Sequence, residues 1–92
     1  MAEPVPARVL AAIAHPLRLA LLVALEAREG TPAELAAATG VTEPEVEQAL
    51  AVLHDVGLVA AGTRRGALAT TGRGWAEVAV RLARLDDAGR QG

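Results

Sequence analysis

The chain has 92 residues, 52% of them hydrophobic, and its formal net charge at pH 7 is -2. This length predicts a single domain with a small core, because such a chain buries only about 60% of the surface that its unfolded state exposes. Cysteine is absent, which excludes disulfides, thiolate metal ligands and thiol nucleophiles. Alanine and leucine are abundant and are the best helix formers, so we expect a mainly α-helical fold.

Two helices separated by a proline are expected at the start of the chain. The first spans residues 7–14. Pro16 disfavours helical geometry at the residue before it and suits the first turn of a new helix, so a second helix is expected over residues 16–29. The apolar residues at helical spacing are Val9, Leu10 and Ile13 in the first helix and Leu17, Leu21, Leu22 and Leu25 in the second.

The segment TPAELAAATGVTEPEVEQALAVLHDVGLV, residues 31–59, predicts two short helices joined by a tight turn. Thr31 and Thr42 each precede a glutamate by three residues, the spacing of a capping box. Gly40 supplies the left-handed conformation that ends the first helix. Two caps so close together leave room for about two helical turns and a sharp corner, which indicates a helix-turn-helix whose second helix, residues 42–56, reads DNA.

This second helix should have one apolar and one polar face. Val46, Leu50 and Leu53 recur at helical spacing and should pack on the preceding helices. The residues expected to face away are Glu43, Glu47, Gln48 and Ala51.

The charge of the same helix is -4, since it contains no lysine or arginine and its acidic residues are Glu43, Glu45, Glu47 and Asp55. Two interpretations stay open. A glutamate can accept a hydrogen bond from cytosine N4, so Glu47 and Gln48 are candidates for base recognition. Alternatively, helix capping alone explains Glu43 and Glu45, and carboxylates that face phosphates are repelled.

A hairpin and a last helix complete the expected elements. Two short runs with β-propensity, residues 58–61 and 67–70, flank Gly-Thr-Arg-Arg-Gly and predict a hairpin with a basic tip. Thr71 can cap a helix over residues 72–85, whose apolar stripe consists of Trp75, Val78, Leu82 and Leu85. The order α-α-α-α-β-β-α predicts a winged helix-turn-helix.

We expect one domain over residues 1–92. Its core should span about residues 7–85, between a flexible arm at residues 1–6 and a flexible tail at residues 86–92.

Several segments resemble the ArsR family of bacterial winged-helix repressors. AIAHPLRLALL, residues 12–22, resembles that family's opening signature, and TPAELAAATGVTEPEVEQAL and VLHDVGLV resemble its helix-turn-helix and its exit into the wing. Residues 71–74 resemble the Thr-x-x-Gly start of its final helix. The resemblance implies a homodimer formed by the first and last helices, with helix 42–56 in the major groove and the wing on the flanking backbone. Family members repress transcription, and many respond to metals or small effectors.

Four features depart from the family pattern. Glu47-Gln48-Ala49 stands where the family usually has Ser-x-His, and the cysteines of its metal-sensing members are absent. Ala20 replaces a second arginine, and residues 67–69 lack the tyrosines common in the wing.

Candidate site residues follow from these patterns. Arg64 and Arg65 at the hairpin tip are candidates for phosphate or minor-groove contacts, the alternative being a solvated turn. Arg18 can contact phosphate, pair with a carboxylate such as Glu26, or lie over the core. The full set of expected DNA contacts is Thr42, Glu43, Glu47, Gln48, Arg64, Arg65, Arg18 and Arg73. The expected dimer interface consists of Val9, Leu10, Ile13, Trp75, Val78, Leu82 and Leu85.

No metal, cofactor or catalytic site is predicted. His15 and His54 lack ligand partners at a recognised spacing, and an interfacial site built from Asp86, Asp87 and a histidine of a second copy is a less favoured alternative. Serine, cysteine, tyrosine and lysine are all absent, so the chain is not expected to be an enzyme.

The expected partners are double-stranded DNA and a second copy of the chain, with an unidentified small effector or protein as a further possibility. Neither a signal peptide nor a membrane span is recognised, so a cytoplasmic location is expected. The rival function is a winged-helix protein-interaction module that has lost DNA binding and uses its acidic helix.

Overall fold

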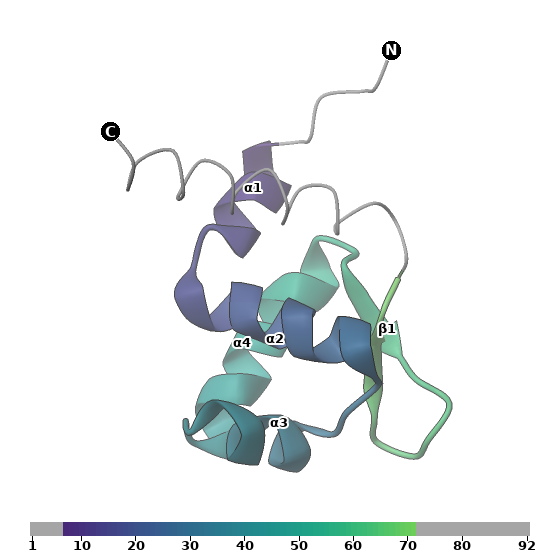
Figure 1. Ribbon diagram of the computed structural model, residues 1–92. Helices are drawn as coiled ribbons and strands as arrows, with labels where there is room; N and C mark the ends of the chain where they lie inside the picture. Colours follow the sequence, from purple (N-terminus) through teal and green to yellow (C-terminus); the bar gives the residue numbers. More distant parts are fainter. Residues whose placement is uncertain (1–6, 72–92) are drawn as a thin grey trace.

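A computed structural model describes residues 7–71 of the chain (Figure 1). Within this range the fold is mainly helical, with one two-stranded antiparallel hairpin. The elements are α1 (Ala7–Ile13), α2 (Pro16–Ala27), α3 (Pro32–Thr39), α4 (Glu43–Asp55), β1 (Val59–Ala61) and β2 (Leu68–Thr70). These confirm the expected order of four helices followed by a hairpin. The predicted helix over residues 72–85 lies outside the described range, and so do Arg73, Trp75, Val78, Leu82 and Leu85.

The break between α1 and α2 lies where the proline pattern predicts it, with Pro16 at the start of α2. The two helices are bent by 89° at this junction. Among the described residues, no single helix is long and apolar enough to cross a membrane, and only α1 and α2 taken together reach that length. The predicted end of α2 at Glu29 was two residues too late, because Arg28 is extended and Glu29 instead binds the hairpin turn.

Both predicted capping boxes are present. Thr31 Oγ1 accepts the Glu34 N–H at 3.1 Å while Glu34 Oε1 accepts the Thr31 N–H at 2.9 Å, and Thr42 and Glu45 make the same exchange. Gly40 ends α3 in the left-handed conformation, with φ 76°. The helix-turn-helix inferred from the spacing of the caps is therefore confirmed.

The hairpin pairs Val59 with Thr70 and Ala61 with Leu68. Its strands begin one residue later than predicted, although the residues preceding them, Leu58 and Ala67, are buried. An isolated bridge joins Gly30 to Leu68, with backbone hydrogen bonds of 3.0 and 2.8 Å. The segment between α2 and α3 is thus fastened to β2, a contact that the sequence pattern did not reveal.

One core lies between α2, α3, α4 and β1, and α1 closes it at one end. The predicted inner face of α4 is buried, whereas Leu17 of α2 is only half-buried. Ile13, expected at a dimer interface, is 1% exposed and belongs to this core. The buried cluster consists of Ile13, Leu21, Leu22, Leu25, Leu35, Val46, Ala49, Leu50, Leu53, Leu58 and Val59.

Candidate nucleic-acid interface

The outer face of α4 is exposed and polar, as its helical period predicts. Thr42, Glu43, Glu47 and Gln48 are all exposed, while Val46 directly between them is fully buried. The inner residues anchor α4 in the core, so the orientation of the outer side chains is set by packing. Pro44, Glu45, Glu47, Gln48 and Ala51 line a shallow depression along this outer face.

The Glu45 carboxylate is occupied by the cap at the start of α4. It accepts the backbone N–H of Thr42 at 3.0 Å and the Thr42 hydroxyl at 3.0 Å. These two hydrogen bonds lower the pKa of Glu45, because they favour the charged form. The capping interpretation therefore holds for Glu45, and the carboxylates of α4 that remain for other contacts include Glu43 and Glu47.

The turn of the hairpin, residues 62–67, is held by a carboxylate from the end of α2. Glu29 accepts the backbone N–H groups of Thr63 at 2.9 Å and Arg64 at 2.6 Å, together with the Thr63 hydroxyl at 2.9 Å. Hydrogen bonds from the Thr63 and Arg64 backbone are the main reason why the pKa of Glu29 is lowered. We call the hairpin with this turn the wing.

Arg64 does not project from the wing as the sequence suggested. Its Nη2 donates to Glu34 Oε1 at 2.8 Å and to the Glu29 carbonyl oxygen at 3.1 Å. The Arg64 guanidinium, with a smaller contribution from the Thr31 N–H, lowers the pKa of Glu34 to about 2, and Glu34 in turn raises the pKa of Arg64. Arg64 thus joins the wing to the start of α3, and the expected contact between Arg64 and DNA stays a prediction. We call the contacts among Glu29, Glu34, Thr63 and Arg64 the wing clamp.

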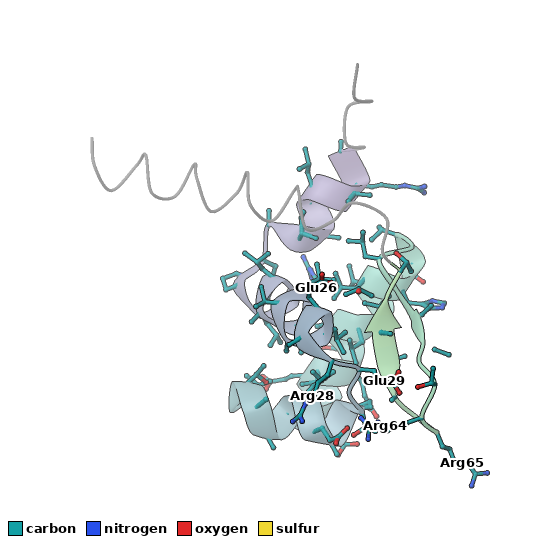
Figure 2. The ribbon with its side chains drawn as sticks, turned by 45° about the vertical axis from the view of Figure 1, so that its right-hand side comes forward. Glu26, Arg28, Glu29, Arg64 and Arg65 are labelled. Carbon is teal, nitrogen blue, oxygen red and sulfur yellow. The ribbon has the colours of Figure 1, made fainter. Side chains whose placement is uncertain are left out.

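Arg65, the next residue, points away from the body of the protein at the end of the wing (Figure 2). It is exposed, and among the described residues no hydrogen bond or ion pair involves its side chain. Of the two arginines predicted at the tip, Arg65 is the one placed to meet an external anion.

Arg18 also has an intramolecular role. Its Nε donates to the carbonyl oxygen of Ala12 and its Nη2 to that of Ala11 at 3.3 Å, so it fastens the end of α1 to α2. Among the described residues Arg18 makes no ion pair with Glu26, which instead accepts the Thr70 hydroxyl at 3.3 Å. The Arg18 guanidinium is therefore bound to α1, and the proposed DNA contacts do not include Arg18.

In the described part of the chain, α1 lies at the end opposite to the wing turn (Figure 1). Leu10 is 40% exposed there and Val9 is half-buried. Within residues 7–71 no group of three or more histidine, aspartate or glutamate side chains is arranged to hold a metal ion. The alternative site with Asp86 and Asp87 lies outside these residues.

The sequence pattern did not predict the contacts of Glu29 with Thr63 and Arg64, or the ion pair between Glu34 and Arg64. Glu29 and Thr63 are 34 residues apart in the sequence, and no local spacing rule predicts a contact over that distance. Gly62 carried the only hint, because a Cβ atom there would lie 2.9 Å from Glu29 Oε2. Any larger residue at position 62 would therefore push the Glu29 carboxylate out of its present position.

These features define the class of winged helix-turn-helix proteins: a capped pair of helices with an exposed second member, followed by an antiparallel wing. A family model described as the arsR family of bacterial regulatory proteins matches residues 15–61, which is more than half of the chain. The chain therefore belongs to the ArsR family of transcription regulators.

Solved structures agree with this assignment. BigR from Xylella fastidiosa, described as a transcriptional repressor, is 27% identical with a TM-score of 0.71, over 90% of this chain and 84% of that one. Reduced HlyU from Vibrio cholerae is 25% identical with a TM-score of 0.71, over 85% and 84% of the two chains. NolR from Sinorhizobium fredii shares the fold: it is 22% identical with a TM-score of 0.75, over 92% of this chain and 96% of that one. A comparison with curated proteins finds no match.

Proposed function

We propose that the protein is a homodimeric, DNA-binding transcription regulator that reads duplex DNA with α4 and contacts the phosphate backbone with the wing. The observation that carries this proposal is the outer face of α4. Its inner face is locked into the core, yet Thr42, Glu43, Glu47 and Gln48 remain exposed beside a sharp turn. A helix held in this way can enter the major groove without unfolding any part of the domain.

The proposed base readers are Glu47 and Gln48. A glutamate carboxylate accepts a hydrogen bond from cytosine N4, and a glutamine amide makes two hydrogen bonds with adenine. Both are exposed near the first turns of α4, the part of a recognition helix that contacts base edges. Glu45 is excluded from this role because its carboxylate is bound in the cap.

The proposed dimer uses the end of the protein that carries α1. Leu10 exposes an apolar side chain there, far from the wing turn. A two-fold dimer built at that end leaves α4 and the wing of both copies free for DNA, and it reads a two-fold symmetric site. Such a regulator acts in the cytoplasm, where bacterial DNA lies, and its function requires no metal in this proposal.

Fluorescence anisotropy with labelled duplexes, titrated over salt, tests the proposal. Each phosphate contact adds about one unit to the slope of log affinity against log salt. Arg65→Gln should therefore flatten the slope by about one unit for each protomer bound. Arg8→Gln is the matched control, since Arg8 is equally cationic and exposed but lies on α1.

Absence of binding by the folded wild-type protein at low salt would refute the proposal. It would favour instead a protein-interaction module that presents the acidic face of α4 to a basic partner. The specific observation behind this second function is that α4 carries Glu43, Glu47 and Asp55 and no lysine or arginine.

A further inference from the structure

We propose that Glu29 is a positioning residue for DNA binding, which holds the wing turn so that Arg65 is presented to the phosphate backbone. This inference rests on the proposed function. It assigns a task to an acidic side chain that, by its charge alone, opposes DNA binding.

Several hydrogen bonds hold Arg64, the residue before Arg65. Arg64 is held by its backbone N–H on Glu29 Oε1 at 2.6 Å and by its guanidinium on Glu34 and the Glu29 carbonyl. Its own carbonyl accepts the Ala67 N–H at 3.1 Å. With Arg64 fixed from the backbone and the side chain, the direction in which Arg65 leaves the wing is also fixed.

The carboxylate that holds the wing turn comes from outside the wing. Glu29 follows α2 and lies directly before the bridge between Gly30 and Leu68, so its own backbone is tied to β2. Its side chain is only 20% exposed, which is unusual for a surface glutamate. Figure 2 shows Glu29 and Arg64 side by side, with Arg65 beyond them at the tip. The wing clamp therefore fixes the position of the wing tip relative to the helical core.

The charge of Glu29 and its hydrogen bonds have opposite effects on the affinity for DNA. Removing one negative charge from a DNA-binding protein generally strengthens its attraction to phosphate. Losing the wing clamp has the opposite consequence, because a mobile turn must be ordered when Arg65 binds, and that ordering costs free energy. The two effects make opposite predictions for a charge-neutralising substitution at Glu29.

The matched comparison is Glu29→Gln against Glu26→Gln. Both remove one charge from the same end of α2, but among the described residues the side chain of Glu26 has a single hydrogen bond, from the Thr70 hydroxyl. Glu26→Gln should bind a labelled duplex as tightly as wild type or slightly tighter. Glu29→Gln should bind about fivefold more weakly than Glu26→Gln, the factor that corresponds to one net hydrogen bond.

The same pair of variants in an Arg65→Gln background identifies the route of the effect. If Glu29 acts through Arg65, the two glutamate variants bind equally once Arg65 is gone, and the salt slope of Glu29→Gln alone resembles that of Arg65→Gln. A Glu29 effect that persists unchanged in the Arg65→Gln background overturns the inference. So does equal affinity of Glu29→Gln and Glu26→Gln in the otherwise wild-type protein.

Two measurements keep the outcomes distinct. Circular dichroism checks that Glu29→Gln is folded, and Thr63→Val, which removes only the hydroxyl donor, provides a milder variant that should weaken binding in the same direction. If wild type binds DNA and the variants do not differ, the positioning role fails while the proposed function stands. If wild type binds no duplex, both fail.

Discussion

Thr42 caps the proposed reading helix, and removing its hydroxyl tests what fixes the start of α4. Thr42 Oγ1 accepts the Glu45 N–H at 3.3 Å and donates to Glu45 Oε2 at 3.0 Å. Thr42→Ala removes both contacts and leaves the Glu45 N–H without its acceptor. Loss of such a cap costs about 1 kcal/mol of unfolding free energy. In a domain of this size, that corresponds to a fall of about 4–8 °C in melting temperature.

Thermal unfolding followed by circular dichroism measures this loss. Thr42→Ser keeps the hydroxyl and should melt close to wild type. Thr31→Ala, which removes the hydroxyl that accepts the Glu34 N–H at 3.1 Å at the start of α3, should also cost about 1 kcal/mol. An unchanged melting temperature for Thr42→Ala would refute the reasoning. A loss in Thr42→Ser as large as that in Thr42→Ala would assign the effect to the methyl group and refute it equally.

Two further predictions concern the core and the wing clamp. Leu53 is fully buried and Val52 is 37% exposed, so Leu53→Ala should lower the unfolding free energy by about 2–5 kcal/mol in a denaturant titration. Val52→Ala should cost much less, and equal losses would contradict the packing of α4. Arg64 and the Thr63 backbone hold the pKa values of Glu34 and Glu29, respectively, below the ordinary 4.5, with Glu34 at about 2. A carboxylate whose pKa is lowered in the folded state contributes stability above pH 4.5, and this stability is lost as the pH falls through the lowered pKa. The difference in melting temperature between wild type and Arg64→Gln should therefore be constant above about pH 5 and shrink towards pH 2. A difference that grows as the pH falls would exclude the ion pair as its source.

The parts of the fold that the sequence predicted are those governed by local rules. Thr31 and Thr42 predict the starts of α3 and α4, because a capping box joins residues only three positions apart. Gly40 marks the turn because its positive φ strongly favours glycine. The hairpin also follows from nearest neighbours, since Gly62 and Gly66 bracket a short turn between β-forming runs.

The parts that the sequence could not supply depend on contacts between distant residues. Arg64 has the same local context as Arg65, yet one folds back onto Glu34 and the other points outward. Arg18 likewise has a helix-start position that suits phosphate, but the bend between α1 and α2 brings carbonyl oxygens within its reach. The position of Arg64 depends on how the wing packs against the start of α3, and that of Arg18 depends on the angle between α1 and α2. Residue spacing encodes neither.

The most direct measurement of the central claim is selection of duplexes from a random pool by the wild-type protein at physiological salt. A homodimer that reads DNA with α4 should enrich a two-fold symmetric sequence, with half-sites about 10 base pairs apart or a multiple of that spacing. Glu47→Ala and Gln48→Ala should each change the preferred bases at one position of each half-site. A pool that remains random after repeated rounds, with the protein folded and dimeric, would contradict the claim that this helix reads DNA.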